Sequence, residues 1–312
     1  MKVLTIGEIL VEVMRKELDK PLDRPGELVG PFPSGAPAIF ADAVSNLGVE
    51  SGIVGVIADD EFGLCIRNRL EDDGVDLKGI KTVAEPATGV AFVSYQSDGQ
   101  RSFLYHMSNS AAGTINKNDI SREFFEGIDL LHINGSSLAM GKNMREVCYR
   151  GVEIAKKEGA KVSFDPNLRP ELLGVEKTRE ICSPVIKHTD ALIPGQDELK
   201  GIMNVSSVEK AVEKTLKNGT QLVAVKDGPE GCKLYKKNQT VRKAAFEFDE
   251  VDPTGAGDAF SAAIVVGWIE GMPLEKLALF ANAMGGFAVT KIGPMEGIVG
   301  RKKVMRMIEE TT

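Results

Sequence analysis

The stretch Asp252-Pro253-Thr254-Gly255-Ala256-Gly257-Asp258-Ala259-Phe260 says more about this 312-residue chain than any other segment. A Gly-Ala-Gly turn that opens an apolar helical run leaves several backbone N–H groups unpaired at the positive end of the helix dipole. The turn is therefore suited to hold an anion, above all a transferring phosphoryl group. Asp258 falls in the first helical turn, where it can take a proton from a hydroxyl that attacks the phosphoryl group. The plainer alternative is a loop-to-helix junction in which Asp258 only stabilises the first turn.

Strand and helix patterns alternate on both sides of this stretch. Lys2 to Ile6 is an apolar run, and apolar residues at helical spacing follow from Ile39 to Leu47. The alternation predicts a mostly parallel sheet with helices on both faces. Ligands gather at the carboxyl ends of such strands, which makes Asn134, Asp165 and Asp227 candidates for the site. The other expected strands are residues 52–57, 129–133, 161–164, 191–193 and 221–225.

Two stretches interrupt this alternation. Residues 9–32 are irregular and rich in proline, and residues 88–107 read as two strands joined by Ser97-Asp98-Gly99-Gln100, a hairpin signal. Together they are expected to form a small β-sheet that projects from the main body, unless they are ordinary surface decoration. Residues 1–312 are otherwise expected to form a single domain.

Composition excludes several classes of protein. A net charge of −7, without a basic stripe, argues against a nucleic-acid or anionic-membrane surface. The longest apolar stretch, residues 259–269, is well short of the roughly 20 residues that a membrane span needs. The four scattered cysteines predict reduced thiols in a cytoplasmic protein. The chain contains neither a P-loop string nor a Gly-x-Gly-x-x-Gly after its first strand, which disfavours P-loop kinases and dehydrogenases.

The string from Asp252 to Phe260 resembles the C-terminal signature of the PfkB, or ribokinase-like, carbohydrate kinases, and the resemblance runs along most of the chain. It implies an α/β fold, a three-layer α/β/α sandwich with a mostly parallel central sheet and a small β-sheet lid. Residues 9–32 and 88–107 would form that lid and exclude water from phosphoryl transfer. The resemblance also implies an ATP-dependent kinase that uses Mg²⁺. Asp258 would be the catalytic base, and the N–H groups of Gly255, Ala256 and Gly257 would form the anion hole.

The expected sugar site departs from the family's motifs. Ser34-Gly35-Ala36-Pro37-Ala38-Ile39 stands where the family has Gly-Gly-x-x-x-Asn, so that Gly35 and Ala36 would approach the substrate while Ile39 lacks the amide. Glu12 stands where many relatives carry an aspartate that binds sugar hydroxyls. As an isolated acidic residue, Glu12 would more often be a solvated charge on a strand.

Asp165-Pro166-Asn167-Leu168-Arg169 resembles the Asp-x-Asn-x-Arg segment of hexose and keto-deoxy-gluconate kinases. The resemblance implies that Asn167 binds a sugar hydroxyl and that Arg169 clamps a transferring phosphate or an anionic substrate. The alternative is a turn with a surface arginine.

The nucleotide and metal sites follow from the same resemblance. Lys226-Asp227-Gly228-Pro229-Glu230-Gly231 resembles the nucleotide loop, in which Gly228 and Gly231 let the backbone pass close to ATP. Glu198 would arrange Mg²⁺ through water, although Gly195 replaces the usual asparagine of that motif. Asp252 is a candidate ligand for a monovalent cation such as K⁺. The remaining residues expected at ATP are Lys226, Thr254 and Asn282.

The identity of the sugar is left open by these motifs. His106-Met107 stands where keto-deoxy-gluconate kinases carry an arginine for the substrate carboxylate, and a thioether cannot pair with a carboxylate. A neutral hexose is therefore favoured, and the resemblance implies a ketohexose such as tagatose or fructose. His106 is expected to be a substrate contact unless it faces solvent on the lid. Keto-deoxy-gluconate kinase and nucleoside kinase remain alternatives. Ser34, Ile39 and Gly195 also leave room for a non-catalytic sugar sensor, and an exposed lid makes a homodimer a candidate.

Overall fold

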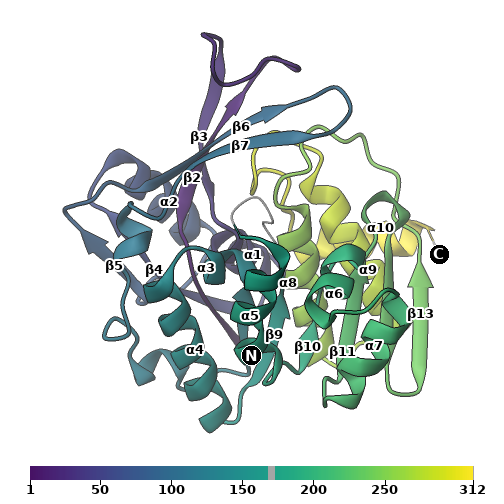
Figure 1. The fold of residues 1–312 in the computed structure, drawn as a ribbon. Helices are drawn as coiled ribbons and strands as arrows, with labels where there is room; N and C mark the ends of the chain where they lie inside the picture. The colour runs from purple at the N-terminus through teal and green to yellow at the C-terminus, as the bar shows by residue number, and fades with distance from the viewer. Residues whose placement is uncertain (168–172, 312) are drawn as a thin grey trace.

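Nine strands form the large sheet at the centre of the computed structural model, which describes residues 1–167 and 173–311 (Figure 1). Their order is β13-β12-β11-β10-β9-β8-β1-β4-β5. Every neighbouring pair from β11 to β5 is parallel, and only β12 and β13 are antiparallel additions. The prediction of a mostly parallel sheet is confirmed. The strands are β1 (Lys2–Ile6), β4 (Glu50–Ala58), β5 (Ile80–Val83), β8 (Leu130–Asn134), β9 (Lys161–Asp165), β10 (Ala191–Leu192), β11 (Leu222–Lys226), β12 (Cys232–Lys236) and β13 (Gln239–Lys243).

Helices cover both faces of this sheet. Along β1, the side chain of Val3 packs in one hydrophobic cluster and that of Leu4 in another, because successive strand residues point to opposite faces. One face is covered by α4 (Lys142–Lys157), α5 (Val175–Ile186), α6 (Gln196–Met203) and α7 (Val208–Lys217), with the short α3 (Gly135–Ala139) beside them. The other face is covered by α1 (Ala36–Asn46), α8 (Ala256–Ile269), α9 (Leu274–Ala288) and α10 (Arg301–Thr311), while α2 (Glu61–Asp72) packs in a third cluster with β4.

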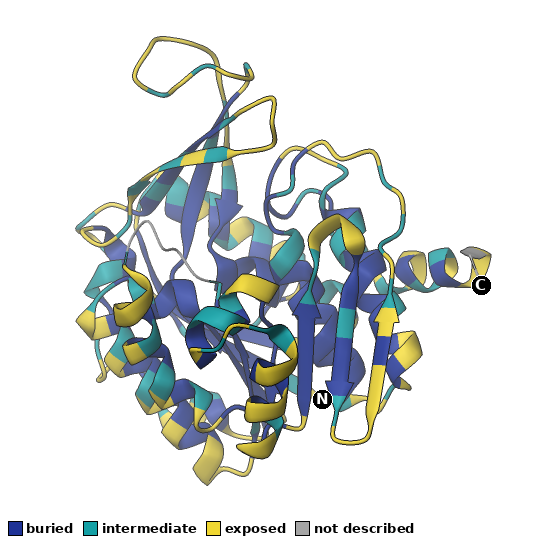
Figure 2. Ribbon diagram, turned by 45° about the vertical axis from the view of Figure 1, so that its right-hand side comes forward, coloured by how far each residue is buried: buried dark blue, intermediate teal, exposed yellow. Residues whose placement is uncertain are grey.

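The four remaining strands form a separate small sheet in the order β3-β2-β6-β7. The small sheet projects beyond the ends of the large one, and its loop tips are exposed (Figures 1 and 2). The hairpin predicted within residues 88–107 is present as β6 (Gly89–Tyr95) and β7 (Arg101–His106). Residues 9–32 are more regular than expected, since they supply β2 (Leu10–Arg15) and most of β3 (Leu28–Ser34).

Short 3₁₀ turns complete the described chain, at Ala111–Thr114, Arg122–Phe125 and Gly228–Glu230. None of the helices in the described ranges has both the length and the apolar character that crossing a membrane would require. Arg169, predicted at the substrate or phosphate, lies outside the described residues.

Candidate active site

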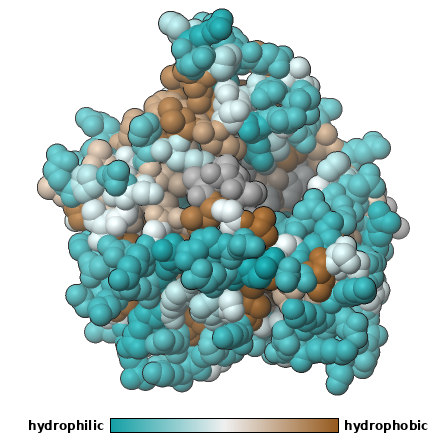
Figure 3. All heavy atoms as spheres, in the orientation of Figure 1, coloured by the Kyte–Doolittle hydropathy of each residue, from teal (hydrophilic) through white to brown (hydrophobic). Residues whose placement is uncertain are grey.

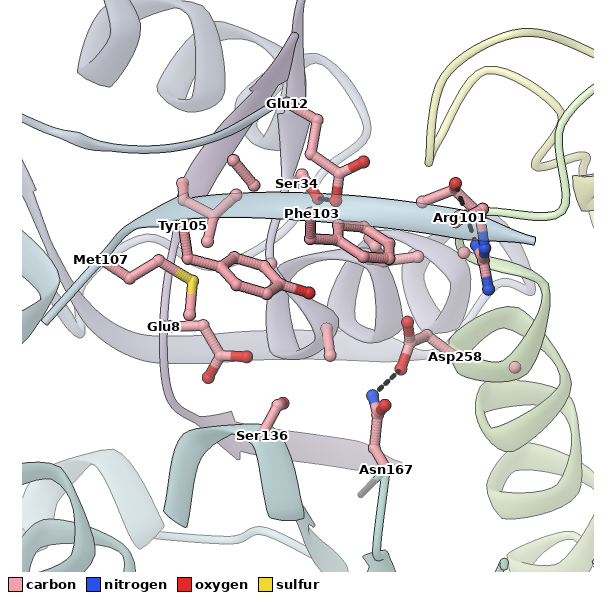
Figure 4. A pocket seen from close by; sticks show the side chains of 18 of the residues that line it. Glu8, Glu12, Ser34, Arg101, Phe103, Tyr105, Met107, Ser136, Asn167 and Asp258 are labelled. Atoms are coloured by element: carbon pink, nitrogen blue, oxygen red, sulfur yellow. Dashed lines mark hydrogen bonds between the residues drawn. The ribbon is translucent and has the colours of Figure 1, made fainter. Parts of the chain in front are cut away.

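A cavity of about 180 Å³ lies between the small sheet and the carboxyl ends of the large sheet's strands (Figure 4). Asp165 and Lys226, the last residues of β9 and β11, line it from below. Gly255, Gly257 and Asp258 close one end. The expectation that the site lies at the carboxyl ends of the strands is therefore consistent with the arrangement of these side chains.

The turn before α8 has the conformation that the Gly-Ala-Gly string predicts. The helix begins at Ala256 and has Gly255 as its N-cap, with φ of 83°. A Cβ at this position would lie 2.2 Å from the carbonyl oxygen of Pro294, so both the backbone angle and the space require glycine. Among the described residues, the N–H groups of Gly255 and Gly257 have no acceptor. These groups face the cavity at the positive end of a buried helix and are suited to an anion.

Asp258 lies in the first turn of α8, and its side chain is nearly buried. Its Oδ1 accepts hydrogen bonds from the amide groups of Asn134, at 3.2 Å, and Asn167, at 3.5 Å (Figure 4). Asn134 ends β8 directly beside Asp165 at the end of β9. The carboxylate is thus oriented by the frame of the large sheet and presented to the cavity, as a general base must be.

Lys226 and Asp165 form a buried ion pair on the cavity floor. The Lys226 Nζ lies 2.7 Å from Asp165 Oδ2 and 2.9 Å from Oδ1, and the Ser261 hydroxyl donates to Oδ2 at 2.8 Å. Burial raises the pKa of Asp165. Burial alone would lower the pKa of Lys226, but the carboxylates of Asp165 and Glu198 raise it, so the ammonium group stays charged. Lys226, predicted at ATP, lines this cavity and a second one beyond it.

Gly35, Ala36 and Glu12 also line the first cavity. Gly35 has φ of 105°, and a Cβ there would lie 2.4 Å from the carbonyl oxygen of Glu8. Only glycine therefore lets the start of α1 pack this closely against the backbone of Glu8. The Glu12 carboxylate accepts a hydrogen bond from the Ser34 hydroxyl at 2.8 Å. Glu8 was missed by the sequence reasoning. Its buried carboxylate lines the cavity and accepts a hydrogen bond from Ser137 at 2.5 Å.

The strand β7 corrects one prediction. Its exposure alternates, and Arg101, Phe103 and Tyr105 line the cavity, whereas His106 is exposed on the outer face. His106 is therefore not brought to the substrate, and its ring instead meets Phe92 edge-on at 6.4 Å. Tyr105 and Met107 take its place (Figure 4). The strand's period of two separates His106 from these residues, and the pairing of β7 with β6 decides which set faces the cavity.

A second cavity, of about 640 Å³, lies on the other side of Lys226 and is lined by Gly228, Gly231 and Asn282, three of the residues predicted at ATP. A Cβ at Gly231 would lie 2.2 Å from the carbonyl oxygen of Lys243. Asn282 donates hydrogen bonds to the carbonyl groups of Lys243 and Ala244, at 3.1 and 2.8 Å, and so holds the cavity wall. The apolar part of the wall comes from residues such as Phe246, Phe248 and Val289.

Thr254 lines the first cavity, although it was predicted at ATP. Its hydroxyl lies 3.2 Å from the Tyr95 hydroxyl and accepts from the guanidinium of Arg101 at 3.3 Å. Tyr95 also donates to Asp252 at 2.8 Å, and burial raises its pKa. Two side chains of the small sheet thus contact the segment that leads into the anion-binding turn. Neither was found from the sequence.

The two candidate metal residues are engaged within the protein. Asp252 accepts hydrogen bonds from the N–H groups of Thr254 and Gly293, at 3.0 and 2.9 Å, in addition to the Tyr95 hydroxyl. Glu198 accepts from the N–H of Gly195 at 2.6 Å and caps its own helix α6. The described residues contain no cluster of three or more His, Cys, Asp or Glu side chains that could hold a metal ion.

Fold and site together define a class, the ribokinase-like kinases of small molecules. The features that define it are an anion-binding helix start beside a buried carboxylate, a small sheet above it, and a second cavity beyond one lysine. Residues 1–299 match the pfkB family carbohydrate kinases, and the chain belongs to this family. It is thus a carbohydrate kinase by family and by fold.

Known relatives extend over the whole chain. Fructokinase-1 of Zea mays is 32% identical, covering 99% of this chain and 98% of that protein. A provisionally named Ribokinase II from E. coli, in complex with ATP and Mg²⁺, is 38% identical with a TM-score of 0.94 and covers 99% of both chains. A fructokinase with bound ATP from Xylella fastidiosa is 25% identical with a TM-score of 0.87 and covers 99% and 98%.

Proposed function

We propose that this protein transfers a phosphoryl group from ATP to a hydroxyl of a neutral hexose, with a ketohexose such as fructose or tagatose as the acceptor. The observation that carries the proposal is the position of Asp258. Its carboxylate lines the first cavity beside the N–H groups of Gly255 and Gly257, which have no acceptor among the described residues, and Gly257 lines the second cavity as well. A base and an anion site therefore share one wall between the two cavities.

In the proposed reaction the sugar occupies the first cavity and ATP the second. Asp258, oriented by Asn134 and Asn167, takes the proton of the attacking hydroxyl. The N–H groups of the turn stabilise negative charge on the phosphoryl group as it passes between them. The small sheet covers the sugar and keeps water from competing as the acceptor.

The residues present suit ATP and Mg²⁺. The second cavity offers apolar walls for a base, and Gly228 and Gly231 let the backbone approach the phosphates. Mg²⁺ neutralises charge on those phosphates when it is bound. It commonly keeps several waters and takes one or two carboxylates, so Glu198 at the start of α6 is sufficient without a larger acidic cluster. Asp252 remains the proposed place for a monovalent cation, which would share a carboxylate that already accepts three hydrogen bonds.

The charges at the end of the first cavity that lies away from Arg101 favour a neutral sugar over a sugar acid. Glu8 and Glu12 contribute carboxylates that can accept hydrogen bonds from hydroxyl groups, and Met107 provides no cation for a substrate carboxylate. The fructokinase relatives support the same choice. Keto-deoxy-gluconate and nucleosides are the competing acceptors, and a non-catalytic sensor would have no use for a base at Asp258.

The outer face of the small sheet is the proposed contact of a homodimer. Leu104 on this face is 48% exposed, and apolar side chains gather over the sheet (Figure 3). Val13 and Phe92, the neighbours of Leu104 across the strands, share its face. A Leu104→Lys variant that becomes monomeric in light scattering would support this contact, and an unchanged mass would remove it. The four free cysteines suit a reducing compartment, and the cytoplasm is the proposed location.

The test is ADP release with Mg-ATP and each of fructose, tagatose, keto-deoxy-gluconate, ribose and adenosine. Asp258→Asn should lower kcat by about 10³-fold, because the base is lost while the shape of the side chain is kept. Asp249→Asn, an exposed acid in the preceding loop, is the matched control and should be unchanged. Turnover of Asp258→Asn near the wild-type rate would remove the base from the mechanism. Sugar binding without ADP formation on every acceptor would favour the sensor.

A further inference from the structure

Arg101 has no part in the proposed function so far, yet it lines the same cavity. It is the first residue of β7, directly opposite Tyr95 in register, and its side chain points inward. Its Nη1 donates to the Thr254 hydroxyl at 3.3 Å, while the Tyr95 hydroxyl lies 3.2 Å from the same oxygen. The small sheet therefore delivers a guanidinium group next to the turn of Gly255.

Among the described residues, no anionic group forms an ion pair with this guanidinium. Lys226, the other cation among the described lining residues, is paired with Asp165. Within the described chain the contacts of Arg101 are with neutral groups, the Thr254 hydroxyl and the Phe103 ring, whose centre lies 5.6 Å from the guanidinium carbon. A half-buried guanidinium is weakly hydrated, and its planar fork of donors matches the oxygens of a phosphoryl group.

Its location identifies which end of the substrate it serves. Arg101 and Asp258 occupy the same end of the cavity, and Tyr105, Met107 and Glu8 occupy the other (Figure 4). Arg101 and Tyr105 are four positions apart on β7, a spacing of about 13 Å along the strand. Arg101 is therefore at the reacting end, away from the residues that would hold the far side of the sugar.

We infer that Arg101 is a further catalytic residue, whose guanidinium contacts the transferring phosphoryl group and stabilises its negative charge in the transition state. The inference rests on the proposed phosphoryl transfer. The bond from the γ-phosphorus to ADP breaks, a bond to the sugar oxygen forms, and Asp258 takes the hydroxyl proton. Arg101 neither gives nor takes a proton. Because β7 carries it, the charge reaches the phosphoryl group only when the small sheet lies over the cavity.

The first experiment compares Arg101→Met, Arg101→Lys and the matched control Arg24→Met, an exposed arginine between β2 and β3. With the preferred sugar, Arg101→Met should lower kcat by about 10³-fold while KM for the sugar changes by less than about threefold. The kcat of Arg101→Lys should lie between those of the wild type and Arg101→Met, because an ammonium group keeps the charge but lacks the planar fork of donors. Methylguanidinium in the assay should restore part of the Arg101→Met rate, and Arg24→Met should match the wild type.

A second measurement does not depend on the sugar. Calorimetry with a non-hydrolysable ATP analogue and with ADP, both with Mg²⁺, should show that Arg101→Met loses about tenfold in analogue affinity and nothing in ADP affinity. A kcat within about threefold of wild type, or a loss confined to KM for the sugar, would overturn the inference. If the wild type phosphorylates no sugar but the analogue affinity still falls, the proposed acceptor is wrong while the contact with the phosphoryl group stands.

Discussion

The two ends of the first cavity are built in different ways. The proposed phosphoryl end consists mainly of backbone N–H groups and one carboxylate that are close in sequence at the start of α8, and the small sheet adds the guanidinium of Arg101 to it. The sugar end is made of side chains from distant segments, and half of them belong to the projecting small sheet. The exact position of the reacting groups matters most at the phosphoryl end, and hydrogen bonds to the sugar hydroxyl groups matter most at the sugar end. Changes at the phosphoryl end should therefore reduce kcat, and changes at the sugar end should raise KM.

After Asp258→Asn and Arg101→Met, Gly255→Ala should have the next largest effect on kcat, because the added methyl group would overlap the carbonyl oxygen of Pro294 and move the turn. A displacement of 1 Å in a reacting geometry costs about 10²-fold in kcat, which is the loss expected here. Gly271→Ala is the control. Gly271 also has a positive φ, 76°, but its Cβ would meet open space, so only about 1 kcal/mol of strain is expected, with normal kcat. Equal kcat values for the two variants would show that the turn does not depend on close packing.

Glu12→Gln tests the other end. Replacing a charged acceptor by a neutral one should raise KM for the sugar about tenfold and leave kcat within about threefold, since the residue is remote from the phosphoryl group. Glu27→Gln, an exposed acid next to β3 that pairs with Lys16, should leave both constants unchanged. Steady-state kinetics with the preferred sugar decide the matter. If Glu12→Gln lowered kcat and left KM unchanged, the proposed difference between the two ends would be wrong.

Tyr95→Phe tests whether the small sheet affects turnover at the phosphoryl end, because the Tyr95 hydroxyl joins this sheet to Asp252 and Thr254. Loss of one buried hydrogen bond is worth about 1 kcal/mol, so kcat should fall about fivefold. Tyr149→Phe removes a hydroxyl that donates to the carbonyl of Ile181 at 2.6 Å, away from the cavity. It should lower the melting temperature without changing kcat. If both variants kept full kcat, the contact between the small sheet and the turn would have no role in turnover.

His132→Phe should have the smallest effect, on stability alone. His132 precedes Asn134 on β8, stacks on Phe40 with ring centres 3.8 Å apart, and has a pKa that burial lowers to about 3. Between this value and the ordinary histidine pKa near 6.5, only the unfolded chain takes up the proton, so stability falls as the pH falls. Urea unfolding of the wild type at pH 7 and pH 5 should differ by about 2 kcal/mol from this group.

The His132→Phe variant should lose that part of the pH dependence, because phenylalanine keeps the stacking and does not titrate. His188→Gln, which changes an exposed histidine, should retain it. If the free energy of unfolding depended on pH in the same way in the wild type and in His132→Phe, groups other than His132 would cause the loss of stability in acid.

The same contrast explains what could be predicted from the sequence. The helix start at Ala256 was predictable because its signal lies in adjacent residues, and Asn134 and Asp165 were candidates because each ends an apolar strand. The choice of His106 was wrong because strand pairing, which the residues alone do not state, decides which face of β7 is inside. Arg101 was missed for the same reason, since nothing in its local sequence separates an inward arginine from a solvated one.

The position of β1 has a consequence for how the protein is made. This strand is synthesised before the other strands of the large sheet, yet it lies inside that sheet, between β4 and β8. Until residue 134 has been synthesised, one edge of β1 has no neighbour, and an unpaired apolar edge invites association with other chains. The turn that carries Asp258 is completed later still. A nascent chain therefore has a long interval in which it is vulnerable to aggregation and still inactive.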